Sequence, residues 1–147
     1  MLRCLTLIVA THKETTQMSN YYESASVEDM VGHTFAKVCE SENAHELMFE
    51  DTDGSTWKLF HSQDCCEYVS LEDVVGDLDD LVGTPIVSAS EETSEGRGDD
   101  NLTQWTFYHF RTIKGTVTLR WHGSSNGYYS VSVDCARTAA QSSSENN

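Results

Sequence analysis

Residues 61–83 read HSQDCCEYVSLEDVVGDLDDLVG, and this stretch decides the fold that the sequence predicts. Its apolar residues recur with the 3.6-residue period of an amphipathic α-helix, at positions 71, 74, 75, 78, 81 and 82. Ser70 is a candidate N-cap, and Gly83, followed two residues later by proline, is a typical helix end. Gly76 costs about 1 kcal/mol relative to Ala in a helix, so it marks a close backbone approach or a break into two short helices. The pattern predicts one main helix near residues 70–82.

Most of the remaining sequence alternates apolar and polar residues, as β-strands do. Residues 45–50 and 55–61 flank Asp51-Thr-Asp-Gly54, a strong hairpin signal, with Leu47 and Phe49 expected on one face together with Trp57 and Leu59. Further strands are expected at 34–40, 85–91, 103–112, 116–122 and 129–135, a short helix at 26–31, and a loop at 92–102. The sum is an α+β fold: a mostly antiparallel sheet of about six or seven strands with one main helix.

The chain divides into one domain and two terminal segments. We expect residues 18–137 to form a single α+β domain, because no linker or internal repeat interrupts them. Residues 1–17 match no element of that domain, so we expect an N-terminal extension that is disordered or not native, with translation starting at Met18. If this segment folds, its apolar run at 5–9 would add an edge strand or a short surface helix. Residues 138–147 are a polar tail.

Charge narrows the classes of partner. The 147 residues include 24 Asp and Glu against 9 Lys and Arg, a net charge of −15. A chain this acidic repels nucleic acids and anionic membranes, so we expect no direct nucleic-acid ligand and no membrane. A protein partner fits better, including a basic nucleic-acid-binding host protein for which the chain would act as a decoy. The five cysteines are odd in number and irregularly spaced, which indicates reduced thiols in a cytoplasm.

The segment before the predicted helix offers a candidate metal site in His61, Asp64, Cys65 and Cys66. Zinc is the metal that such residues favour, although zinc sites usually space their cysteines two to four residues apart. One alternative is a pair of buried structural cysteines, with Asp64 capping a turn. Another is a Cys–His nucleophile, which the neighbouring carboxylates disfavour because they oppose thiolate formation. We therefore assign no catalytic residue.

Candidate partner-binding residues are polar or aromatic positions expected to face solvent. Asp73, Asp77 and Asp80 would share the outer face of the predicted helix, where they are either a solvated surface or a carboxylate face that binds a cation or mimics phosphates. Tyr128 and Tyr129 follow an Asn-Gly turn and are expected at a loop edge.

Two further groups of residues have both a structural and a functional interpretation. His109 and His122 lie on strands expected to form a hairpin, so they could approach each other as metal ligands or remain half-exposed polar positions. The aromatic cluster is either core or a ligand platform; it comprises Trp105, Phe107, Tyr108 and Trp121. The known nucleotide-binding, hydrolase, metalloprotease and EF-hand signatures are absent from the sequence.

Four motifs together resemble a family of small proteins encoded mainly by bacteriophages and prophages and catalogued only as a domain of unknown function. They are HxxDCCE at 61–67, EDxxGDLxDLxG at 72–83, IKG at 113–115 and SNGYYS at 125–130. The resemblance covers roughly residues 30–135. It implies a phage or prophage origin and a bacterial host cytoplasm, and it carries no known activity.

These observations favour a non-enzymatic binding protein that acts on a host or phage protein, in one form as a nucleic-acid mimic or anti-defence factor. The first alternative is a metal-binding domain or small metal-dependent enzyme built on the candidate metal site. The second is a minor virion component. No cofactor is expected unless that site holds zinc.

Overall fold

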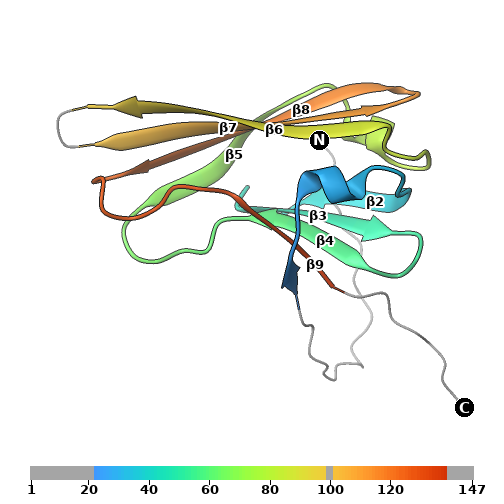
Figure 1. Ribbon diagram of the computed structural model, residues 1–147, viewed down its shortest axis with the longest axis horizontal. Helices are drawn as coiled ribbons and strands as arrows, with labels where there is room; N and C mark the ends of the chain where they lie inside the picture. Colours follow the sequence, from blue (N-terminus) through green and yellow to red (C-terminus); the bar gives the residue numbers. More distant parts are fainter. Residues whose placement is uncertain (1–21, 99–100, 139–147) are drawn as a thin grey trace, which may run out of the picture.

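The computed structural model describes residues 22–98 and 101–138, which form two antiparallel β-sheets packed face to face (Figure 1). The five-stranded sheet has the order β1-β9-β4-β3-β2, and the four-stranded sheet has the order β5-β8-β7-β6. The elements are β1 (Glu23–Ser24), η1 (Val27–Met30), β2 (Phe35–Glu40), β3 (Glu46–Asp51), β4 (Thr56–Phe60), β5 (Tyr68–Val75), η2 (Leu78–Leu81), β6 (Ser88–Arg97), β7 (Leu102–Thr112), β8 (Gly115–Ser125) and β9 (Asp134–Arg137). The two η elements are single turns of 3-10 helix.

The predicted helix at 70–82 is wrong, and with it the α+β class. Residues 68–75 form strand β5, which pairs with β8, and only 78–81 form a helical turn. None of the described residues belongs to an α-helix. The described residues therefore form an all-β sandwich with two short 3-10 turns.

A β-bulge explains why this strand has the periodicity of a helix. The β5–β8 register shifts between Leu71 and Asp73, so one extra residue separates the two inward-facing positions Leu71 and Val74. A spacing of two residues thus becomes three. Leu78 and Leu81 then repeat the three-residue spacing, because they lie one turn apart in η2. A bulged strand followed by a 3-10 turn therefore produces the i, i+3, i+7, i+10 pattern of an amphipathic helix.

The predicted hairpin at Asp51–Gly54 is confirmed. Leu47 lies opposite Leu59 and Phe49 opposite Trp57, and all four side chains are buried. The inward residues of β8 face them from the other sheet, where Val117, Leu119 and Trp121 are also fully buried, as their alternation predicts. The core between the sheets therefore comes mainly from two central strands of each layer.

Other expectations fail in the four-stranded sheet. The predicted loop at 92–102 is largely strand, because β6 extends to Arg97 and pairs with β7 along its length. His122 lies opposite Trp105 and His109 opposite Thr118, so the two histidines are separated along the outer face of the sheet and do not form a pair of ligands. The aromatic cluster divides: Tyr108 and Trp121 are core, whereas Trp105 and Phe107 lie half-buried on the outer face.

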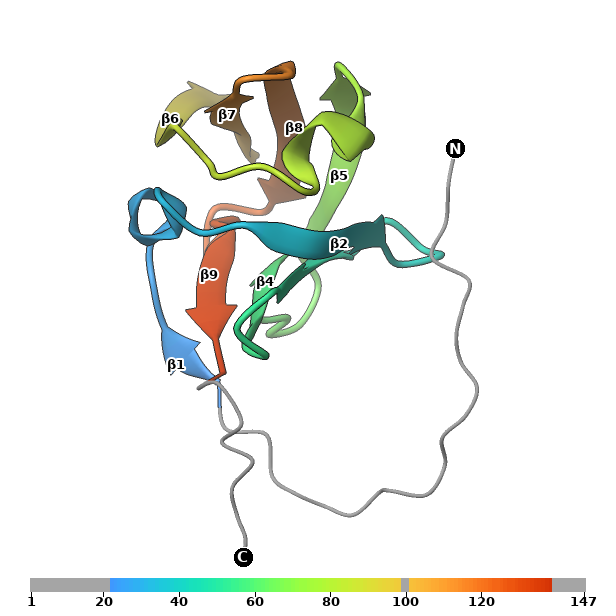
Figure 2. The ribbon, with the colours of Figure 1, turned by 90° about the vertical axis from the view of Figure 1, so that its right-hand side faces the viewer.

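The two 3-10 turns lie at opposite lateral openings of the sandwich (Figure 2). Turn η1 packs against β6 and buries Val27 and Met30; Ser26 caps it, at the start of the short helix predicted there. Turn η2 lies between β2 and β8 and buries Leu81. The predicted extension at 1–17 and most of the tail at 138–147 lie outside the described residues. No helix in the described part of the chain is long and apolar enough to cross a membrane.

Candidate functional site

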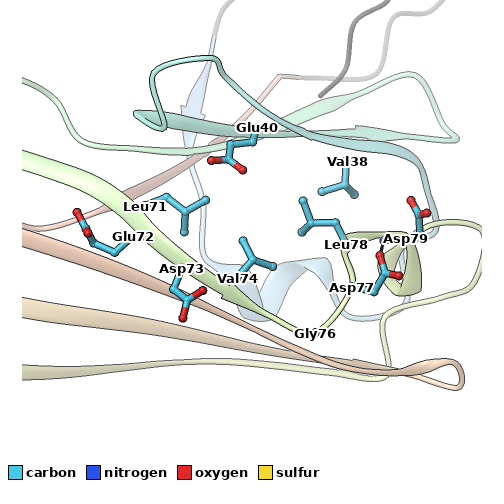
Figure 3. A pocket seen from close by; sticks show the side chains of 10 residues that line it. All are labelled: Val38, Glu40, Leu71, Glu72, Asp73, Val74, Gly76, Asp77, Leu78 and Asp79. Carbon is cyan, nitrogen blue, oxygen red and sulfur yellow. Dashed lines mark hydrogen bonds between the residues drawn. The ribbon is translucent and has the colours of Figure 1, made fainter. Parts of the chain in front are cut away.

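A cleft of about 620 Å³ opens between the two sheets, where the edge strands β2 and β5 face each other beside η2 (Figure 3). This volume falls within the range of about 300–1,000 Å³ typical of ligand pockets. A hydrogen bond from the Leu71 amide to the Ala44 carbonyl (2.9 Å) joins the sheets on one side of the cleft. A hydrogen bond from Gly83 N to Phe35 O (2.9 Å) ties the segment after η2 to β2 on the other side. Between these two contacts the edges remain apart.

The cleft has an apolar floor and an acidic rim. The side chains of Val38, Leu71, Val74 and Leu78 converge on its middle (Figure 3). Five carboxylates line it around them, from Glu40, Glu72, Asp73, Asp77 and Asp79. The ion pairs among the described residues include only one of these, in which Arg120 Nη1 lies 3.0 Å from Asp73 Oδ2. The cleft therefore combines apolar surface with largely uncompensated negative charge.

The turn between β5 and η2 shapes the end of the cleft. Gly76 has φ +111°, and a Cβ there would lie 2.6 Å from the Thr116 carbonyl oxygen of β8. Glycine therefore allows the chain to turn sharply against β8. Asp77 then caps η2 by accepting a hydrogen bond from the Asp79 amide (3.1 Å). On the far side of η2, Lys114 Nζ donates to the carbonyls of Asp79 and Val82 at 3.1 and 2.7 Å.

The residues proposed from sequence for partner binding do not form one surface. Asp73 and Asp77 line the cleft, but Asp80 lies behind it, with its carboxylate against Gly115 at the start of β8. Tyr128 is exposed and packs edge-on against Tyr129, at the opposite end of β8. The shared helical face predicted for the three aspartates does not exist, because these residues belong to a strand and a 3-10 turn.

The loop from His61 to Glu67 connects the two sheets and is organised by one buried carboxylate. Glu67 accepts hydrogen bonds from the backbone amides of Asp64 (2.7 Å) and Cys65 (2.9 Å) and from His61 Nε2 (2.7 Å). Burial alone would raise the pKa of Glu67, but these hydrogen bonds outweigh it and lower the pKa to about 2. His61 also donates from Nδ1 to the Ser132 carbonyl at 2.6 Å. Both ring nitrogens of His61 therefore face oxygen acceptors.

The candidate metal ligands of this loop do not converge. Within the described part of the chain, the donor atoms of His61, Asp64, Cys65 and Cys66 form no metal-sized group. Both nitrogens of His61 are engaged, and Cys65 and Cys66 are exposed and joined to each other in a disulfide. The cysteines are therefore neither buried nor, in this state, thiols that could bind metal.

A group that sequence reasoning did not identify lies beside the β3–β4 turn. The ligand atoms of His33, Asp51 and Asp53 fall within 4.8 Å of one another. Internal partners already occupy them: Asp51 Oδ2 accepts from His33 Nδ1 (2.6 Å) and from Trp57 Nε1 (3.2 Å). Arg137 Nη2 lies 3.6 Å from Asp53 Oδ2 and supplies the local positive charge. These contacts hold the β3–β4 turn against the sheet. The ligand atoms are already paired, so the group is a poor metal site.

Sequence reasoning also missed most of the cleft. Glu40 and Val38 were assigned to a strand, and Glu72 and Asp79 were not singled out among the surface acids. The available signal is the acid-rich sequence on both sides of Gly76, but its position across the cleft from β2 depends on how the two sheets pack.

The fold and the cleft define the class of protein: a small antiparallel β-sandwich with an acidic cleft between two sheet edges. The chain belongs to the family described as Domain of unknown function (DUF7448), whose model matches residues 28–135. No curated protein and no solved structure matches the chain.

Proposed function

We propose that the chain is a non-enzymatic binding protein of bacteriophage or prophage origin, which takes a cationic segment of a host or phage protein into the acidic cleft. One observation carries the proposal: five carboxylates surround an apolar floor, and among them only Asp73 forms an ion pair with another described residue. The family resemblance supports the phage origin and the host cytoplasm as the place of action.

The chemistry of the cleft favours Lys or Arg side chains. Their aliphatic stems can pack on the apolar floor while the charged ends reach the carboxylates on the rim. The net charge of −15 would also accelerate encounter with a basic partner, and this acceleration decreases as salt screens the charges. Binding should therefore be tight at low ionic strength and salt-sensitive.

A nucleic-acid mimic remains a special form of this proposal, in which the partner is a basic nucleic-acid-binding protein. Such a mimic would have to present its carboxylates where a groove shaped for nucleic acid can reach them. Asp73 and Asp77 instead line a concave cleft, which favours a segment that enters the cleft over a groove that wraps around the protein.

The test measures binding of fluorescent Lys-containing and Glu-containing octapeptides to the full chain at about 50 and 300 mM salt. The Lys peptide should bind, and it should bind more weakly at high salt. The variant Glu40→Gln/Asp77→Asn/Asp79→Asn removes three rim charges and should lose at least tenfold in affinity; Asn at 77 can still cap η2. The matched control, Glu23→Gln/Asp64→Asn/Glu95→Gln, removes three exposed charges outside the cleft lining.

Equal loss of affinity in both triple variants would contradict a cleft-specific site and leave only general attraction by net charge. A pull-down from a bacterial host lysate, made with both variants as baits, then identifies a natural partner. That partner should be retained by the control and lost by the cleft variant.

A further inference from the structure

Strand β2 is an edge strand of the five-stranded sheet and faces the cleft, and its register shows which backbone groups point away from β3. The Ser41 amide donates to the Glu46 carbonyl (2.9 Å), and Cys39 lies opposite Met48 two residues earlier. In an antiparallel pair, hydrogen-bonded positions alternate with positions whose N–H and C=O groups point away from the neighbouring strand. Val38 and Glu40 therefore direct these groups away from β3. No backbone hydrogen bond from another described segment reaches the N–H or C=O groups of Val38 and Glu40.

The side chains of the same two residues point between the sheets. Val38 lies opposite Phe49 and packs against the core, and Glu40 lies opposite the fully buried Leu47. Both side chains line the cleft (Figure 3). A strand added to this edge would hydrogen-bond to Val38 and Glu40 and would point its own alternate side chains into the cleft.

The β2 edge also restricts which segments can pair with it. A bulge between Phe35 and Lys37 and the inward-pointing charge of Glu40 are devices that discourage indiscriminate strand pairing. A cation opposite Glu40 would convert this obstacle into an attraction. A second copy of the chain is disfavoured as the occupant, because each copy carries −15. Charge complementarity points instead to a cationic segment from another protein.

We infer that the partner binds as an extended β-strand on the β2 edge, with a Lys or Arg opposite Glu40 and an apolar residue opposite Val38. The ligand is thus an extended segment with a Lys or Arg two residues away from an apolar residue, and β2 recognises it through main-chain hydrogen bonds. This inference rests on the proposed function, since it assumes that the acidic cleft is the binding site.

The probe is the capped octapeptide Lys-Thr-Val-Thr-Lys-Thr-Val-Thr, tested on the full chain. In the proposed pairing the Lys and Val amides face β2, and the Thr amides face away. N-methylation of one central Lys and one central Val should weaken binding about tenfold or more, because it removes two main-chain hydrogen bonds. N-methylation of two Thr residues is the matched control and should change affinity less than threefold. Amide exchange of Val38 and Glu40, followed by NMR, should slow at least tenfold on saturation.

The other outcomes are distinguishable. If binding depends on the rim carboxylates but both methylated peptides bind equally, strand addition is overturned while the acidic cleft remains the site. If the probe does not bind at all, both proposals fail. If the Val38 and Glu40 amides are already protected in the free protein, another segment of the chain occupies the edge, and the inference is overturned.

Discussion

Replacing Gly76 by alanine separates the strand-and-turn structure of residues 68–81 from the helix that the sequence predicts. In a helix, Gly→Ala stabilises by about 1 kcal/mol. In the sandwich, Gly76 has φ +111°, and a Cβ would lie 2.6 Å from Thr116 O and 3.2 Å from Val117 Cα. Both are backbone atoms of β8, so the strand itself would have to move. The two structures predict effects of opposite sign.

The magnitude follows from three contributions. The left-handed backbone costs a non-glycine residue about 1–2 kcal/mol. The clash with fixed backbone adds about 1–3 kcal/mol, as in overpacked cores. The less flexible unfolded chain of the alanine variant returns about 0.4–1 kcal/mol. Gly76→Ala should therefore destabilise by about 1–5 kcal/mol, which corresponds to a fall in Tm of roughly 3–20 °C for a domain of this size.

Gly83→Ala is the matched control. Its φ is +87°, but nothing lies within 4 Å of the new Cβ, so only the backbone cost applies and about 1 kcal/mol is expected. Urea unfolding of the wild type and both variants, followed by Trp fluorescence, gives the three free energies of unfolding. A stabilising Gly76→Ala, or equal losses at both positions, would refute the assigned turn against β8.

Three further predictions concern the loop at 61–67 and the cysteines. The pKa of Glu67 is lowered to about 2 in the folded protein. The stability that its carboxylate contributes is therefore present above about pH 4.5 and is lost as the pH falls toward 2. The variant Glu67→Gln should flatten the acid side of a profile of Tm against pH. The variant Cys65→Ser/Cys66→Ser should lower the free energy of unfolding in urea by at most about 1 kcal/mol. The disulfide joins adjacent residues and so constrains the unfolded chain very little, and Glu67 holds the 61–67 loop independently. A loss of several kcal/mol would show that the disulfide anchors the 61–67 loop. Burial, together with the nearby carboxylates of Asp29 and Glu91, raises the pKa of Cys135 to about 12. After mild reduction, iodoacetamide at pH 8 should therefore modify Cys65 and Cys66 before Cys135. Peptide mass mapping of the modified protein measures this order.

The parts of the fold that depend on local sequence were predictable. The Asp51–Gly54 turn and the alternation on its two strands specify a hairpin with a buried Leu47–Leu59 and Phe49–Trp57 face. The alternation of β8 likewise identifies its inward residues. In these segments the side-chain period is two throughout, so the register and the buried face follow directly from the sequence.

The predictions from sequence failed where tertiary contacts change the side-chain spacing of a strand or determine which strands lie next to each other. The bulge after Leu71 changes the spacing of β5 from two to three, and no local signal distinguishes it from a helix. The cleft brings Val38 and Glu40 close to residues more than thirty positions later, and that proximity depends on which strands become sheet edges. Asp73 and Asp77 were identified by charge but placed on the wrong kind of element.

The position of β9 has a consequence for how the sheet is completed during synthesis. Strand β1 is joined to the five-stranded sheet through β9, which lies between it and β4. On a ribosome, the β3–β4 hairpin would emerge early, with the backbone of β4 unpaired along one side. The open side of β4 can pair only when Asp134–Arg137 has left the exit tunnel. Only then can Glu23–Ser24 pair with β9. A nascent chain arrested before β9 should therefore stay susceptible to proteolysis and aggregation through β4.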